Sequence, residues 1–162
     1  MLFFGHIGIS AFFGLFLYLS PLIVGISSIL PDFVDKGLLL AGLSPYTRLV
    51  AHNLFFGPAL SAIVYLATKR KAVAIAVLFG TYMHLIEDIR TPLPWLWPLV
   101  TYDLVPVTGI KIVVDLFEIF TETIGLSLLV SLFVFKKNLI DAREKIIVVV
   151  KDFYDKRLVK KI

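Results

Sequence analysis

The chain of 162 residues contains no cysteine. This absence excludes disulfide bonds, thiolate zinc sites and cysteine nucleophiles. Any bound metal must therefore take nitrogen and oxygen ligands, a donor set that favours Zn, Mn, Fe or Mg over Cu(I) or an iron–sulfur cluster.

Charge is also scarce: 17% of the residues are charged, 59% are hydrophobic, and the mean hydropathy is +0.92. A soluble domain carries about 25% charged residues. A membrane span needs about 20 apolar residues, and four regions are apolar enough to supply them: 2–30, 46–68, 72–89 and 112–135. Residues 1–5 lack the basic start of a cleavable signal, so we expect the first apolar segment to remain in the mature protein.

These regions predict an all-α fold, a polytopic membrane helix bundle with about four to five membrane helices. The first apolar region is expected to break at Pro21, because proline ends or kinks a helix. We assign the bundle to residues 1–137 and a basic amphipathic tail to 138–162, where residues 146–150 would also suit a strand.

Positive charge is concentrated in two places. Residues 136–162 hold nine Lys or Arg against four Asp or Glu, and Lys69-Arg70-Lys71 forms a basic turn. The positive-inside rule places both in the cytoplasm and predicts a multi-pass protein of the cell membrane. No basic–aromatic interleaving accompanies this charge, so we predict contacts with anionic lipid headgroups and no nucleic-acid partner.

The three histidines lie in or beside apolar sequence, where ionisable groups are costly and usually functional. Counted from Arg70, His52 lies 18 residues before and His84 and Asp88 lie 14 and 18 residues after. At about 1.5 Å per residue, all three reach roughly 21–27 Å from the turn. His84 and Asp88 also share one helix face, since they are four residues apart.

The first region reaches the same level only if it folds back. In one straight helix His6 and Asp32 would lie about 39 Å apart, whereas a break at Pro21 returns them to similar heights. Glu122 lies 14 residues before Lys136 and reaches this level as well. The predicted metal ligands are His6, Asp32, His52, His84 and Asp88.

Each residue also has a structural explanation. Asp32 suits a helix cap, and Asp35 beside Lys36 and Gly37 suggests an exposed loop. Glu118 and Glu122 suit a helix N-terminus. Arg48 and Arg90 can orient a phosphate or simply anchor the chain at the membrane interface.

Four short motifs in this order resemble the membrane-bound metal-dependent hydrolase family, also described as LexA-binding, inner-membrane-associated hydrolases. The matching residues are His6, Leu30-Pro31-Asp32, Arg48-Leu49-Val50-Ala51-His52-Asn53, and His84 to Asp88 with Thr91 and Pro98. The resemblance covers roughly residues 2–100 and implies a metal-dependent hydrolase. Thr47 replaces the family's first His of an HRxxTHS-like motif, Asn53 replaces its Ser, and Asp35 departs from an Asp-x-Asp box. The lost His implies one metal instead of two, or an inactive member.

The leading functional hypothesis is hydrolysis of a lipid-linked phosphoester or similar amphipathic ester at the outer leaflet, with membrane lipids as partners. Zn is the expected cofactor, with Mn or Mg as alternatives, and Asp88, Glu122 and Arg48 are the candidate catalytic residues. An ion or proton transporter or channel using the His/Asp cluster is the rival, and an inactive membrane scaffold is a third hypothesis. The oligomeric state stays open, with a homodimer as one alternative.

Overall fold

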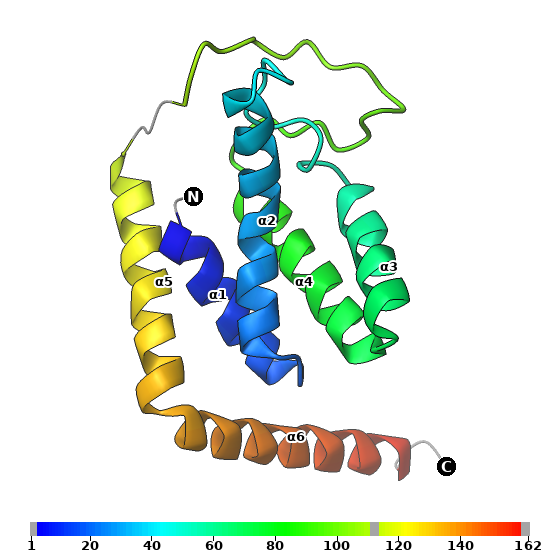
Figure 1. Cartoon of the computed structure of the whole chain (residues 1–162). Coiled ribbons are helices and arrows are strands. Elements are labelled where there is room, and N and C mark those ends of the chain that lie inside the picture. The colour runs from blue at the N-terminus through cyan, green and yellow to red at the C-terminus, as the bar shows by residue number, and fades with distance from the viewer. Residues whose placement is uncertain (1–2, 111–113, 160–162) are drawn as a thin grey trace. The chain divides into compact units, whose positions relative to one another are not determined.

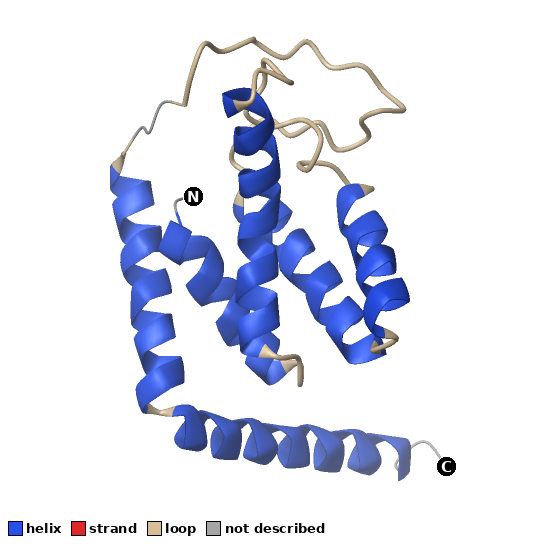
Figure 2. Ribbon diagram, in the orientation of Figure 1, coloured by secondary structure: helices blue, strands red, loops and turns tan. Residues whose placement is uncertain are grey.

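A computed structural model describes residues 3–110 and 114–159, with side chains described through residue 152. Helices are the regular structure of these residues, and no strand occurs among them (Figure 2). The helices are α1 (Phe3–Phe16), α2 (Pro21–Leu40), α3 (Phe56–Thr68), α4 (Lys71–Glu87), α5 (Leu116–Val134) and α6 (Lys136–Val159). The chain divides into two compact units, Met1–Leu129 and Val130–Ile162.

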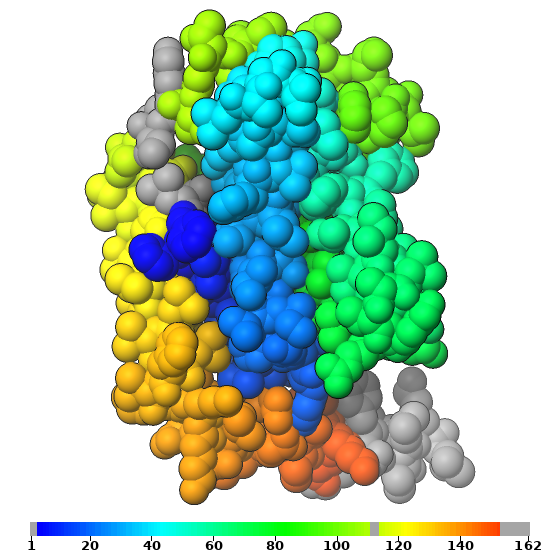
Figure 3. Space-filling model, viewed as in Figure 1, coloured from blue at the N-terminus to red at the C-terminus, as the bar shows by residue number. Residues whose placement is uncertain are grey.

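In the first unit, α2 packs against both α1 and α4, and α3 packs against α4 (Figure 1). The side chains of α2 run through the middle of the face shown in Figure 3. Small residues allow the helices to approach closely: a Cβ on Gly80 of α4 would overlap the carbonyl oxygen of Val24 in α2. This tight crossing brings polar side chains of α2 and α4 into one interior.

The first apolar region breaks before Pro21, which is the first residue of α2. Proline is favoured there because its missing N–H has no partner within the first turn of a helix. Tyr18, just before the break, adopts a left-handed conformation with φ of 58°. The chain therefore turns back, and His6 and Asp32 come to the same end of the unit.

The segment between α2 and α3 is organised by buried polar side chains. Both carboxylate oxygens of Asp35 accept N–H groups from this segment: Leu49 N–H at 2.6 Å, Val50 N–H at 2.9 Å and Ala51 N–H at 3.0 Å. Asn53 accepts the N–H groups of the next turn, Phe55 and Phe56. Because these side chains bind the backbone donors, residues 46–55 form turns, and α3 begins only at Phe56.

The prediction of four to five membrane helices is wrong. Among the described residues only α5 is long and apolar enough to cross a membrane, by length and composition alone. The helices α1, α3 and α4 have 14, 13 and 17 residues, fewer than the about 20 that a span needs. Although α2 has 20 residues, it carries Asp32, Asp35 and Lys36. The predicted span over 46–68 loses its first ten residues to the turns around Asp35.

The second unit contains the end of α5, from Val130, and the helix α6. The division into a bundle over residues 1–137 and a tail over residues 138–162 stays a prediction. The basic tail is a helix, α6, and residues 146–150 are helical rather than extended. Their apolar side chains are exposed within the described structure.

Candidate metal centre

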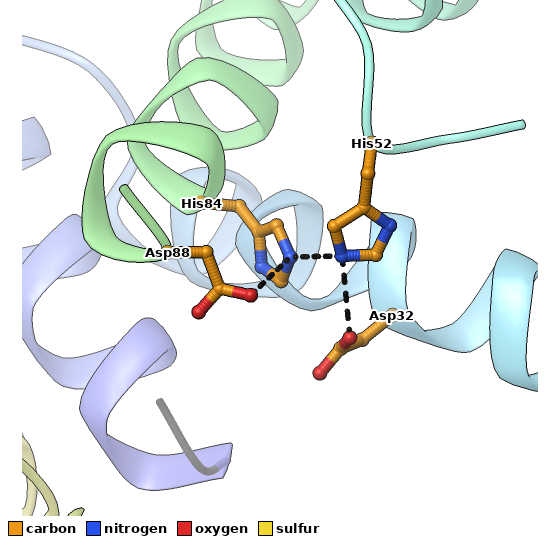
Figure 4. A group of neighbouring side chains, drawn as sticks. All are labelled: Asp32, His52, His84 and Asp88. Carbon is orange, nitrogen blue, oxygen red and sulfur yellow. Dashed lines mark hydrogen bonds and ion pairs between the residues drawn. The ribbon is translucent and has the colours of Figure 1, made fainter. Parts of the chain in front are cut away.

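Four polar side chains from three segments meet in the interior of the first unit: Asp32 of α2, His52 of the 46–55 segment, His84 of α4, and Asp88 at the C-cap of α4 (Figure 4). One ligand atom from each lies within 4.8 Å of the others. His52, His84 and Asp88 are each at most 1% exposed. This His/Asp cluster can hold a metal ion.

The spacing of the cluster suits a small ion. His84 Nε2 lies 3.0 Å from His52 Nε2, and His52 Nε2 lies 3.4 Å from Asp32 Oδ1. Two nitrogens bound tetrahedrally to zinc at about 2.0–2.1 Å are about 3.3 Å apart. Both histidines therefore need to move by only a few tenths of an ångström to share one ion, and in Figure 4 their rings point toward each other.

Asp35 fixes the orientation of His52. The Nδ1–H of His52 donates to Asp35 Oδ2 over 2.7 Å, which leaves Nε2 directed at His84 and Asp32. A carboxylate behind a histidine is the usual arrangement that holds a metal-binding imidazole in place. The interpretation of Asp35 as an exposed loop residue is wrong, because its side chain is 1% exposed. In the sequence, the spacing of three residues between Asp32 and Asp35 puts both on one face of a helix, and this spacing could have indicated that Asp35 lies near the site.

His6 lies beside the cluster rather than in it. Its ring stacks on His84 with the centroids 4.2 Å apart, and its Nε2 lies 3.4 Å from Asp88 Oδ1. On the other side, His6 Nδ1 contacts Glu87 Oε2 at 2.6 Å, and Glu87 Oε1 accepts the hydroxyl of Ser10 at 2.9 Å. Neither Glu87 nor Ser10 is predicted from the sequence, where only the position of Glu87 next to Asp88 indicates a role.

Two cations balance the carboxylates of the cluster. Arg48 donates from Nε and Nη2 to Asp88 Oδ2, at 3.1 and 3.0 Å, and Lys36 pairs with Asp32 one turn away. Burial by itself would raise the pKa of Asp32 and of Asp88. His52 and Lys36 beside Asp32, and His6 and Arg48 beside Asp88, instead hold both pKa values well below their usual range. Both carboxylates are therefore ionised and available to a cation.

The histidines differ in their protonation. Burial, followed by the charges of His6 and His52, lowers the pKa of His84 to about 3. Burial also opposes protonation of His6, but Asp88 and Glu87 outweigh it and raise the pKa of His6 to about 9. His84 is thus neutral, as a metal ligand must be, and its buried Nδ1 has no hydrogen-bond partner within the described structure.

Glu122 lies in a different environment. Its two carboxylate oxygens accept the N–H groups of Phe4 and Gly5 at the start of α1, at 2.9 and 2.8 Å. Close by, a Cβ on Gly125 would overlap the carbonyl oxygen of Phe4, so α1 and α5 cross in direct backbone contact. We call this set, Glu122 and Gly125 with the first residues of α1, the α1–α5 junction. Glu122 is not among the residues that form the cluster.

The chain is similar to no family model, no curated protein and no solved structure in the comparisons made. The resemblance to the membrane-bound metal-dependent hydrolases therefore stays a prediction from the motifs. The chemistry of the site rests on its own geometry.

Proposed function

We propose that this protein is a membrane-associated, metal-dependent hydrolase of a lipid-linked phosphoester or a similar amphipathic ester. The observation that carries the proposal is the buried cluster of two imidazoles and two carboxylates, with His52 oriented by Asp35. Buried ionisable groups are costly unless a partner compensates them. A divalent cation compensates this set, and nitrogen and oxygen donors in these proportions favour Zn, with Mn or Mg as alternatives.

Asp32, His52 and His84 are the best-placed ligands, because His52 Nε2 lies 3.0 Å from His84 Nε2 and 3.4 Å from Asp32 Oδ1. Asp88 Oδ2 lies 4.0 Å from His84 Nε2 and so stands at the edge of the set. Three protein ligands and an open position are typical of catalytic zinc sites. When bound, such an ion lowers the pKa of a coordinated water to about 7 and polarises a phosphoryl or acyl oxygen.

Asp88 is the candidate proton acceptor for the attacking water, since it is ionised, buried and beside the ligands. Arg48, held at Asp88, places a permanent positive charge where a phosphoryl oxygen would approach, and its side chain is 30% exposed. We assign no chemical step to Glu122, because both of its oxygens already accept backbone N–H groups.

The membrane part of the proposal rests on α5 and the charge that follows it. Lys136 and Lys137 come directly after α5, so the positive-inside rule places this end in the cytoplasm. The other end of α5, near Leu116, then lies on the outer side. Residues there line a pocket with Glu87 and Asp88, which gives the cluster access to lipid headgroups at that face.

The direct test is metal content and turnover measured on the same preparation. Protein purified in detergent should contain near-stoichiometric metal, hydrolyse a lipid phosphoester, lose activity on chelation, and regain it with Zn or Mn. Full activity in protein proven to be metal-free would overturn the proposal. No metal uptake by a well-folded protein at neutral pH would overturn it as well.

A further inference from the structure

His84 lacks the kind of support that fixes the orientation of His52. Asp35 accepts the Nδ1–H of His52, whereas the buried Nδ1 of His84 has no hydrogen-bond partner within the described structure. A metal-binding imidazole is usually held through its second nitrogen, and loss of that partner weakens metal binding. Among the described residues, the orientation of the His84 ring therefore depends on the side chains that pack against it.

His6 packs on the face of the His84 ring. The two ring centroids lie 4.2 Å apart with an angle of 31° between the ring planes, and both side chains are at most 1% exposed. The His52 ring lies edge-on to His84, with the centroids 4.9 Å apart and the planes at 69°. Because protein interiors are close-packed, a large rotation of the His84 ring would drive its edge into His6. The stack therefore keeps Nε2 of His84 directed at His52.

The same histidine also contacts the proposed proton acceptor. His6 Nε2 lies 3.4 Å from Asp88 Oδ1, while Arg48 donates from Nε and Nη2 to Asp88 Oδ2. The two oxygens of Asp88 are thus contacted by different segments, Oδ1 by α1 and Oδ2 by the 46–55 segment. These two contacts restrain the plane of the carboxylate beside the His/Asp cluster.

His6 is itself held by buried polar groups on two sides. Its Nδ1 contacts Glu87 Oε2 at 2.6 Å, and Glu87 Oε1 accepts the hydroxyl of Ser10, one turn further along α1, at 2.9 Å. The hydroxyl of Ser28 in α2 donates to the carbonyl oxygen of His6 at 3.0 Å. Ser10 and Ser28 are fully buried, and the Glu87 side chain is 5% exposed. Because both its backbone and its ring are held, His6 gives His84 a fixed surface to pack on.

We propose that His6 is a positioning residue of the metal centre. Its ring orients His84 toward the ion, and its Nε2 orients Asp88 toward the attacking water. Glu87 and Ser10 act through His6, because they hold the Nδ1 side of its ring. This inference rests on the proposed function, since it concerns how the same site is held, and it gives His6 a role other than that of the ligand predicted from the sequence.

The test uses the full chain in detergent with Co²⁺ as the probe, because the visible absorption bands of Co²⁺ report the number and geometry of its ligands. His6→Asn removes the ring and should weaken Co²⁺ binding by about 10–100-fold, the range for loss of a residue that orients a ligand. It should also change the absorption bands, because His84 is free to turn. Phe13→Asn is the control, since Phe13 is half exposed on the same helix, and it should change neither.

A second variant separates the ring of His6 from its nitrogens. His6→Phe/Glu87→Gln keeps a ring against His84 and also neutralises the carboxylate that would otherwise lose its partner. This variant should retain the wild-type absorption bands and most of the affinity for Co²⁺. Its kcat for a lipid phosphoester should fall with KM unchanged, because Asp88 loses the contact with Nε2 and substrate binding does not involve His6.

The outcomes separate this inference from the proposed function. A wild type that takes up no Co²⁺ overturns both. Co²⁺ binding by the wild type, with equal affinity and equal bands in folded His6→Asn, overturns this inference alone, since His84 is then oriented without the stack. Equal losses of affinity in His6→Asn and His6→Phe/Glu87→Gln, with the bands changed in both, would overturn it by showing that His6 is itself a ligand.

Thermal unfolding shows whether each variant is folded. If His6→Asn does not fold, Glu87→Ala takes its place, because it removes the group that holds the His6 ring and leaves the ring itself present. Weaker Co²⁺ binding by Glu87→Ala would support the inference, and wild-type affinity together with wild-type kcat would overturn it.

Discussion

Two regions of the first unit bring acidic side chains from distant segments into close contact, with different results. At the His/Asp cluster, Asp32 and Asp88 meet two imidazoles, and the ligand atoms of all four residues face one another. At the α1–α5 junction, each oxygen of Glu122 accepts one backbone N–H from the start of α1. The carboxylates in the two regions are of similar type, and counting along the helices predicts a similar height for them.

The difference lies in what satisfies the side-chain atoms. Each oxygen of Glu122 accepts a backbone N–H, and Asp35 accepts three backbone N–H groups besides the Nδ1–H of His52, so these carboxylates hold structure. In the cluster, Asp32 Oδ1 is buried without a hydrogen bond although His52 Nε2 lies 3.4 Å away. Such atoms require a ligand or another explanation. Backbone hydrogen bonds to both oxygens therefore indicate a structural carboxylate. Buried side-chain atoms that face one another without a hydrogen bond indicate a binding site.

The largest effect should come from removing both histidines of the cluster. Elemental analysis of purified His52→Ala/His84→Ala protein should find no specifically bound metal, because both nitrogen ligands are gone. Glu122→Gln protein, prepared in parallel, should keep its metal. An equal metal content in the double variant and the wild type would show that the ion binds elsewhere. The His/Asp cluster would then not differ from the α1–α5 junction as a binding site.

Asp35→Asn should have the next largest effect. Asparagine cannot accept the His52 Nδ1–H and three backbone N–H groups in the same way, so His52 loses its fixed orientation. Loss of such a supporting carboxylate weakens metal binding by about 10–100-fold, which competition with a chromophoric zinc chelator can measure. Asp103→Asn, which removes a charge from an exposed loop, is the matched control. Unchanged affinity in a folded Asp35→Asn protein would show that His52 is oriented without this carboxylate.

Helix periodicity and the rise per residue were sufficient for the cluster residues on α2 and α4, whereas the count that placed His52 assumed a helix over residues 46–55 that the structure does not contain. His84 and Asp88 share a helix face, and the break at Pro21 returns Asp32 toward His6, as the structure has them. Counting along a helix predicts height well because the rise is constant. The residues His52 and Asp35 meet for a different reason, a long-range contact between a helix and a turn.

Hydropathy predicted too many long helices because it does not detect side chains that accept backbone N–H groups and so prevent a helix. Residues 46–55 are apolar enough to extend α3, but Asp35 and Asn53 accept their N–H groups and hold them in turns. The role of Asp35 could not be predicted locally, since its partners lie 14 to 17 residues away. Glu122 instead binds the N-terminus of α1, a pairing that its count along the helix does not distinguish from the cluster.

A bulky residue at the helix crossing should destabilise the α1–α5 junction while leaving the ligands intact. Gly125→Val places side-chain atoms against the carbonyl oxygen of Phe4, and overpacking of this kind typically costs about 1–3 kcal/mol. The midpoint of thermal unfolding in detergent should fall, and metal bound per folded molecule should not. Gly37→Ala is the control, because a Cβ there meets nothing within 4 Å and alanine is the better helix former. Loss of metal from folded Gly125→Val protein would show that the crossing supports the cluster.

Glu122→Gln should have the smallest effect and separates the two regions most sharply. The amide keeps one acceptor oxygen but loses the charge and one of the two N–H contacts at the start of α1, a change of about 0.5–2 kcal/mol in stability by analogy with helix caps. Thermal unfolding should register this loss, whereas metal content and the rate of phosphoester hydrolysis should match the wild type. If hydrolysis instead collapses while stability and metal content are retained, Glu122 acts in the reaction itself. Backbone hydrogen bonds to both oxygens would then fail as a sign of a purely structural carboxylate. The catalytic role predicted for Glu122 from its count along the helix would be correct.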